Sequence, residues 1–326
     1  MTTPEKLQTL LDDAVASGEE HACQLAVYLD GELVCDLAAG ADTRTFFPLF
    51  SAGKGVAVTA VLRLVERGVL GLDAPVANYW PEFAANGKEQ ITLRDVLTHR
   101  AGMHILPPAS FAELADWDHM CALLASRRPV GVPGTRTRYQ PVTFAWLLGE
   151  PARRAAGKAF KQIVRDEVLD PAGISDFGFG VAPEDEPRTL PVFHRPQDAN
   201  DWRAGFIGEP AVRRACIPSA NAFGTARALA KHYMALLAGL LSPGMLAKAL
   251  TPPDRSSDPV KGWERFGLGY ILWDGGAFGH GGALGAEGLA VPERRLAVGF
   301  ATDTLAGSHP VRDRISAELG LPPRRW

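Results

Sequence analysis

Ser51 and Lys54 have the spacing of a nucleophile and its base. They fit the pattern S-x-x-K and stand just before VAVTAVLRLVERGVL, the most apolar helix that the sequence predicts. Residues three apart share one face of a helix, so the amine can reach the hydroxyl. The helix N-terminus supplies free N–H groups for an oxyanion, and burial lowers a lysine pKa and frees it to accept a proton. The pair therefore predicts acyl transfer through Ser51. The alternative is that Ser51 only caps the helix and that Lys54 is solvated.

Tyr139 is the second candidate for proton transfer. Of the five tyrosines it alone ends a polar loop rich in glycine and proline, GVPGTRTRYQP, which enters a new helix. A phenol at such a place can share a proton with serine and lysine and deliver it to a leaving group. The alternative is a tyrosine that packs the loop against the core.

His280, Gly281, Gly282 and Ala283 form a third element between two predicted strands. Small residues on a strand let a substrate acyl group lie along the backbone. The Ala283 N–H can then complete an oxyanion hole with the N–H of Ser51. The alternative is a glycine-rich turn with a surface histidine.

The remaining histidines and cysteines indicate no cofactor. No histidine pair or cysteine pair has metal-ligand spacing, and no nucleophile elbow or phosphate-binding loop occurs. We interpret His99 as structural. Cys23 and Cys35 fall on neighbouring strands of a predicted hairpin whose turn is Asp30-Gly31. There residue 23 faces about residue 38, so we expect reduced thiols.

These candidates need a scaffold that brings distant segments together. Strands are predicted near both ends of the chain, and helices with long loops between them. We therefore expect an α+β fold: an antiparallel sheet flanked by helices and built from both termini, beside a helical subdomain. The expected division is 1–50 with 263–326 for the sheet and 51–262 for the helices, with the site in the cleft between them.

Composition narrows the partners. Charged residues make up 22% and hydrophobic residues 46%, which is ordinary for a globular protein. A net charge of -3 provides no basic field for nucleic acid or an anionic membrane. The first twenty residues predict an amphipathic helix without a secretory apolar core, and no apolar run is long enough to span a membrane. We expect a cytoplasmic protein with a small-molecule substrate; composition does not determine its oligomeric state.

The order S-x-x-K, tyrosine, His-Gly-Gly resembles the serine β-lactamase, penicillin-binding-protein and family VIII carboxylesterase superfamily. Further blocks resemble its esterase-type members, among them FPLFSAGKGVAVTAVLRLVERGVLGLDAPVANYWPEF, ITLRDVLTHRAGM and FGHGGALGAEGLAVPERRLAVGFATD. The resemblance spans nearly the whole chain. It implies a β-lactamase/transpeptidase-like fold, a Ser51 acyl-enzyme, and Lys54 and Tyr139 as general base and acid. It also implies an oxyanion and substrate site at His280, Gly281, Gly282, Ala283 and Gln140.

Two departures from the family pattern bear on the substrate. β-Lactamases of this type usually have asparagine two residues after the tyrosine, where this chain has Pro141. His280 replaces the lysine that usually meets a substrate carboxylate. Both changes favour a small neutral ester over a β-lactam or peptide, unless another arginine such as Arg138 meets the carboxylate. The segment ADTRTFFPLF before Ser51 also looks short for the esterase branch.

Three other functions stay open at this point. An acyltransferase would keep the same residues and replace water by an acceptor alcohol or amine. A weak β-lactamase or DD-peptidase would tolerate the two departures. A non-catalytic scaffold would keep the fold without turnover, and the intact set of Ser51, Lys54 and Tyr139 argues against it.

Overall fold

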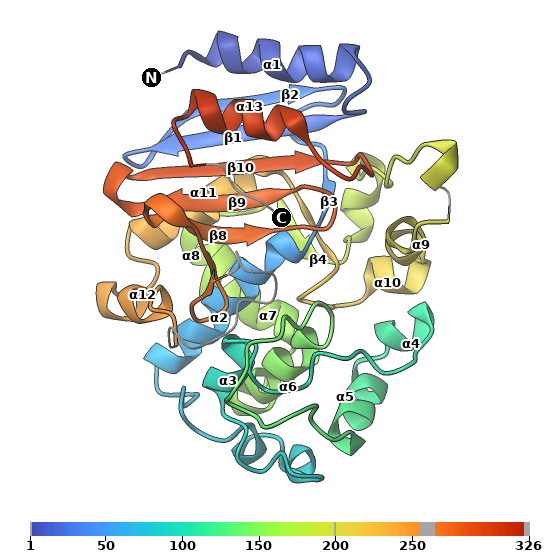
Figure 1. Cartoon of the computed structure of the whole chain (residues 1–326), viewed down its shortest axis with the longest axis vertical. Helices are drawn as coiled ribbons and strands as arrows, with labels where there is room; N and C mark the ends of the chain where they lie inside the picture. Colours follow the sequence, from blue (N-terminus) through green and yellow to red (C-terminus); the bar gives the residue numbers. More distant parts are fainter. Residues whose placement is uncertain (1, 199, 254–264, 323–326) are drawn as a thin grey trace.

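The structure is a computed structural model that describes residues 2–198, 200–253 and 265–322. Its main feature is a seven-stranded antiparallel sheet in the order β2-β1-β10-β9-β8-β7-β6 (Figure 1). The strands are β1 (Cys23–Leu29), β2 (Glu32–Ala39), β6 (Arg265–Phe266), β7 (Ile271–Leu272), β8 (Phe278–Gly281), β9 (Glu287–Val291) and β10 (Leu296–Thr302). The first and last strands, β1 and β10, pair over seven residues. The predicted α+β class, with a sheet built from both termini, is confirmed.

Helices cover both faces of this sheet. Alternate residues of β1 point to opposite faces: Leu25 and Val27 pack with α1 (Pro4–Ala16) and α13 (Pro310–Glu318), whereas Ala26 and Tyr28 pack in the core that includes α11 (Ala226–Leu237). A Cβ at Gly299 of β10 would lie 2.0 Å from a backbone carbonyl of α11, so glycine permits this close approach. The position of α11 differs from the expected division, because this helix lies within 51–262 yet packs on the sheet. The boundary at 263 lies outside the described residues.

The N-terminal hairpin forms as predicted, with one change of register. Asp30 and Gly31 have φ angles of 51° and 95°, and Leu29 pairs with Glu32 across the turn. An irregularity between Val27 and Tyr28 shifts the pairing by one residue, so position 23 faces Ala39 and not residue 38. Cys35 faces Val27, and all four cysteines are free thiols.

The rest of the chain is mainly helical but contains a second, small sheet. Its strands β3 (Phe47–Phe50), β4 (Phe177–Phe179) and β5 (Ala222–Gly224) lie in the order β3-β5-β4. The sequence predicts a loop over 41–50, because a four-residue strand whose partner is more than 170 residues away carries no local signal. The helices are α2 (Lys54–Glu66), α3 (Leu93–Leu97), α4 (Phe111–Ala115), α5 (Trp117–Ser126), α6 (Phe144–Ala156), α7 (Phe160–Val164), α8 (Asp170–Ala172), α9 (Trp202–Gly208), α10 (Pro210–Arg214) and α12 (Pro243–Ala249).

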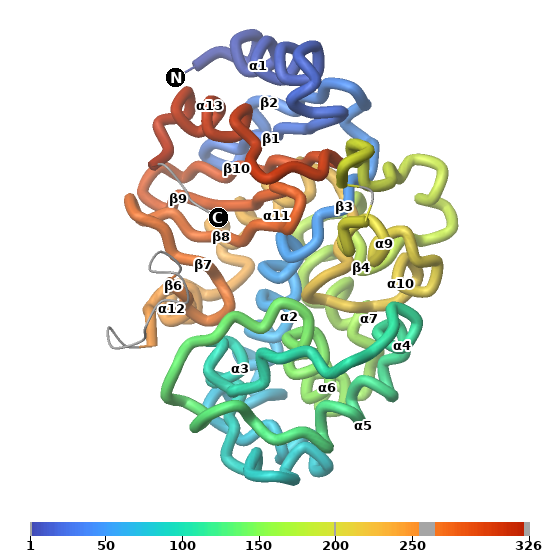
Figure 2. Tube along the Cα trace, turned by 45° about the vertical axis from the view of Figure 1, so that its right-hand side comes forward, coloured from blue at the N-terminus to red at the C-terminus, as the bar shows by residue number. Residues whose placement is uncertain are grey.

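One predicted helix is two. FAELADWDHMCALLAS breaks at Asp116, which ends α4 and caps α5 by accepting a hydrogen bond from the His119 N–H. In contrast α2 is continuous, and ten of its thirteen residues are buried. It lies at the centre of the molecule, in contact with β8 on one side and with α6 and α7 on the other (Figure 2). The fold thus places the N-terminus of its most buried helix beside the large sheet.

Candidate active site

Ser51 lies at a sharp turn from a strand into a helix. It follows β3 directly and begins the 3₁₀ turn Ser51–Gly53, which continues into α2. Phe50 has φ 49° and ψ −129°, a conformation that costs energy for a residue with a side chain. The strained turn presents the Ser51 hydroxyl beside the free N–H groups of a helix start.

Lys54 is fully buried and has three oxygen neighbours. Its Nζ lies 2.9 Å from Ser51 Oγ, and it donates hydrogen bonds to the backbone carbonyls of Pro141 (2.8 Å) and Ser219 (2.6 Å). Ser51 Oγ also donates to the Ser219 carbonyl at 3.0 Å. Burial holds the Lys54 pKa well below its usual range. A neutral amine has two hydrogens for the two carbonyls and one lone pair. This lone pair can accept the single Ser51 proton once the hydroxyl turns from the Ser219 carbonyl to Lys54.

A second buried lysine, Lys88, has a different set of hydrogen-bond partners from Lys54. Lys88 is equally buried, and its Nζ donates to three backbone carbonyls, those of Ala85, Ala125 and Arg127. Three acceptors satisfy all three hydrogens of an ammonium group. Lys54 has two carbonyls and a hydroxyl that can itself donate, so its surroundings suit a proton acceptor.

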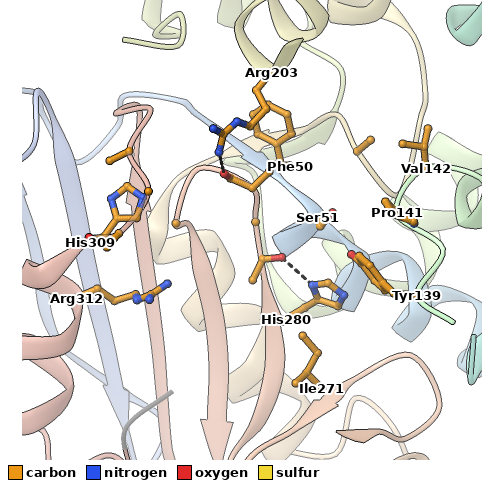
Figure 3. A pocket seen from close by; sticks show the side chains of 18 of the residues that line it. Phe50, Ser51, Tyr139, Pro141, Val142, Arg203, Ile271, His280, His309 and Arg312 are labelled. Atoms are coloured by element: carbon orange, nitrogen blue, oxygen red, sulfur yellow. Dashed lines mark hydrogen bonds between the residues drawn. The ribbon is translucent and has the colours of Figure 1, made fainter. Parts of the chain in front are cut away.

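Tyr139 comes from the loop before α6 and lines the same pocket as Ser51. Lys54 Nζ lies 5.0 Å from the centre of its ring, which stacks on Phe266 (centroids 5.7 Å, 10° between planes) and meets His99 edge-on (4.9 Å). Figure 3 shows the hydroxyl end of Tyr139 directed toward Ser51. The structure thus brings the three proposed proton-handling side chains together.

His280 is held neutral on β8. It is 2% exposed, and its Nδ1 donates to the carbonyl of Gly281 at 2.8 Å. Burial lowers its pKa to about 3, with a further contribution from Lys54. At neutral pH this side chain carries no charge, so it is not the surface histidine of the alternative interpretation.

The segment after β8 approaches the serine closely. A Cβ at Gly282 would lie 2.2 Å from the carbonyl of Leu49 in β3, so only glycine lets the two backbones meet here. Ala283 follows at the beginning of the tight turn that is closed by a bond from the Gly285 N–H to the Gly282 carbonyl (2.9 Å). The four residues 280–283 all line the pocket, as does Ser51.

This pocket has a volume of about 430 Å³. Sequence reasoning missed five of its larger side chains, four of which lie far from any motif: Phe50, and then Trp202, Arg203, His309 and Arg312. The only local signal was Phe50, which precedes the serine. Arg312 is 8% exposed, and Arg203 donates to the carbonyl of Ala283. Arg138, the arginine that the sequence suggested for a carboxylate, does not line the pocket.

Gln140 does not reach the pocket either. Its side chain is fully buried, with Oε1 3.3 Å from His99 Nδ1. Successive side chains of an extended segment point to opposite sides, so Tyr139 faces the pocket and Gln140 faces away. The expectation that Gln140 contacts substrate is not supported by this geometry. His99 is fully buried, and its backbone carbonyl accepts the Arg138 N–H, in keeping with a structural role.

Within residues 2–198, 200–253 and 265–322, no three histidine, cysteine or acidic side chains are close enough together to hold a metal ion. The described part of the chain also has no helix that is both long and apolar enough to cross a membrane.

The site and the fold define a class of protein. Residues 7–321 match the family model described as Beta-lactamase, and the chain belongs to that family. Among its relatives, the esterase/beta-lactamase LipL of Mycobacterium tuberculosis is 34% identical over 84% of this chain and 75% of its own length. Esterase EstB of Burkholderia gladioli is 29% identical over 75% of this chain and 70% of its own length. The crystal structure of a family VIII carboxylesterase superposes with a TM-score of 0.89 at 29% identity, covering 97% of this chain and 96% of that one.

Proposed function

We propose that this protein is a serine esterase that cleaves small carboxylic esters through an acyl-enzyme on Ser51. The observation that carries the proposal is the environment of Lys54, a buried amine with two carbonyl acceptors and the Ser51 hydroxyl at 2.9 Å. This arrangement suits a neutral amine that accepts a proton from serine. The esterase names of LipL, EstB and the family VIII carboxylesterase support the same reaction class.

Acylation begins with transfer of the hydroxyl proton from Ser51 to Lys54. Ser51 Oγ attacks the ester carbonyl carbon, and the N–H groups of Ser51 and Ala283 stabilise the oxyanion. The bond to the alkoxide then breaks as Tyr139 donates its phenol proton to the departing oxygen, and the Lys54 ammonium restores the proton to Tyr139. Deacylation repeats these steps with water as the attacking group: water gives up a proton, its oxygen bonds to the acyl carbon, and Ser51 leaves with a proton.

A fluorophosphonate probe tests this proposal most directly. An activated serine displaces fluoride from phosphorus, so intact mass should show one adduct per chain, and peptide mapping should locate it at Ser51. Ser51→Ala should remain unmodified under the same conditions. A scaffold that has kept the fold without an activated serine would give no adduct, and this result would refute the proposed mechanism.

β-Lactamase activity is the second candidate, because LipL is named as both esterase and β-lactamase. We expect it to be weak: Pro141 offers no side-chain amide, and neutral His280 offers a carboxylate no charge. Losing a charge-assisted hydrogen bond lowers a rate by roughly ten- to a hundredfold. We therefore expect kcat/KM for p-nitrophenyl butyrate to exceed that for nitrocefin on the same preparation.

A nitrocefin value equal to or above the ester value would show that this interpretation is wrong. Arg312 is then the residue to replace, because it is a cation of the pocket that can meet a carboxylate.

A further inference from the structure

The end of β8 presents an open backbone edge to the pocket. On one side β8 pairs with β9, and the Gly282 N–H continues this pairing with a bond of 2.7 Å to the Ala286 carbonyl. On the other side the pairing of β8 with β7 stops at Gly279, which lies opposite Ile271, the first residue of β7. Backbone groups of residues two apart point the same way, so those of Gly281 face the open side beyond β7. An acyl group bound at Ser51 would lie along this edge.

Both backbone carbonyls of this segment that face the pocket already accept a hydrogen bond. The Gly281 carbonyl accepts from His280 Nδ1 and the Ala283 carbonyl from Arg203 Nη1, each at 2.8 Å (Figure 3). Asp201 holds Arg203 in place through two side-chain bonds, Nε to Oδ1 at 2.9 Å and Nη2 to Oδ2 at 2.8 Å. Asp201 also caps α9 by accepting the Arg203 N–H at 2.8 Å. The guanidinium is therefore a fixed part of the pocket wall.

Two further carbonyls close to Ser51 also accept hydrogen bonds. Those of Pro141 and Ser219 accept from Lys54. The site therefore offers N–H donors to a substrate carbonyl, while these four carbonyl oxygens around it are already bound. Such a pocket wall suits an acyl group that has hydrogen-bond acceptors and no hydrogen-bond donor.

We propose that Arg203 is a specificity-determining residue that selects acyl groups without an N–H near the ester carbonyl. The inference rests on the proposed esterase function and narrows its substrates to simple alkanoyl and ketoacyl esters, against acylamino and peptidyl esters. An acylamino N–H that enters the pocket loses its water and must either stay unpaired or displace the guanidinium. A carbonyl oxygen has a second lone pair, but Arg203 lines the same pocket and its Nη1 already occupies one acceptor position of the Ala283 carbonyl.

Two phenyl esters of nearly equal shape isolate the effect of the acylamino N–H on the rate. Phenyl N-acetylglycinate carries an N–H where phenyl 4-oxopentanoate carries a CH₂, and both release phenol. The readout is kcat/KM for phenyl N-acetylglycinate divided by kcat/KM for phenyl 4-oxopentanoate. Each kcat/KM is first divided by the rate constant for hydroxide-catalysed hydrolysis of the same ester. Arg203→Met frees the Ala283 carbonyl, and we expect this ratio to rise about three- to tenfold, the usual worth of one neutral hydrogen bond.

Arg213→Met is the matched control. Arg213 lies in the next helix, α10, forms an ion pair of 2.6 Å with Glu186, and does not line the pocket. The ratio should stay at its wild-type value. Asp201→Asn keeps Arg203 but weakens its anchor, so it should raise the ratio by a smaller amount and serves if Arg203→Met does not fold.

The outcomes separate this inference from the proposed function. If Arg203→Met lowers both rates equally and leaves the ratio unchanged, Arg203 only positions the turn and the inference is wrong, while the esterase stands. If the wild-type protein hydrolyses neither ester and takes no fluorophosphonate, the proposed function and this inference both fall.

Discussion

Ser51→Ala is expected to reduce the hydrolysis of p-nitrophenyl acetate and butyrate to the uncatalysed background, a loss of at least roughly 10⁴-fold. Without Oγ no acyl-enzyme forms, and the remaining oxyanion donors act only on direct attack by water. The measurement is the release of p-nitrophenol by purified protein at matched concentrations. The change itself should be mild for the fold, because it removes one hydroxyl, bonded to the Ser219 carbonyl, at the mouth of a pocket.

Ser126→Ala provides the matched control for the nucleophile. Its hydroxyl donates to the Leu123 carbonyl at the end of α5, away from the pocket, so this variant should keep wild-type rates. Wild-type esterase activity in Ser51→Ala would mean that the nucleophile is wrongly assigned.

Lys54→Met and Tyr139→Phe are each expected to cost roughly 10²–10⁴-fold in kcat/KM, the usual contribution of general acid–base catalysis. The losses need not add, because the three side chains act as one unit. Two controls match the chemistry of each change: Lys88→Met removes a buried lysine bonded only to carbonyls, and Tyr79→Phe removes a hydroxyl that accepts the Gly71 N–H. Both can lower stability, yet their folded fraction should keep its turnover.

The pH profile distinguishes loss of a base from loss of packing. Burial lowers the Lys54 pKa, so the neutral amine predominates above that lowered value. kcat/KM should therefore rise with pH through the Lys54 pKa and reach a plateau well below pH 10.5, the ordinary lysine value. Lys54→Met should lack this rise. A wild-type rate that still grows about tenfold per pH unit between pH 8 and pH 10 would mean that Lys54 is protonated at rest and is not the base.

Local sequence was enough for the features that depend on near neighbours. The spacing of Ser51 and Lys54 places them on one helical turn whatever surrounds them. The apolar run of α2 predicts burial, and Asp30-Gly31 predicts the hairpin, because each signal lies within one element. The α+β class followed from the same local periodicities, since strands near both termini have to pair with each other to bury their apolar faces.

The sequence identified Lys54, Tyr139 and His280 as candidate site residues, but it did not predict the surroundings of these side chains. The partners of Lys54 include the carbonyls of Pro141 and Ser219, 87 and 165 positions away. The loss of charge on His280 depends on complete burial beneath other segments. Neither could be predicted from spacing, because a contact between distant positions depends on how whole elements pack.

Several details of the site were decided by tertiary structure alone. Gln140 turns to His99, an irregularity in β1 shifts the hairpin register, and a short sheet anchors the turn before Ser51. Arg203 comes from a helix that the sequence did not predict, and only the packing of α9 brings its guanidinium to the Ala283 carbonyl. The sequence by itself pointed to Ser51, Lys54 and Tyr139 as the proposed reacting groups, because the chemistry of these side chains and the helical spacing of Ser51 and Lys54 are local properties. The tertiary structure decided the lowered pKa of Lys54 and the shape of the pocket, because burial and hydrogen-bond partners come from segments far apart in the chain.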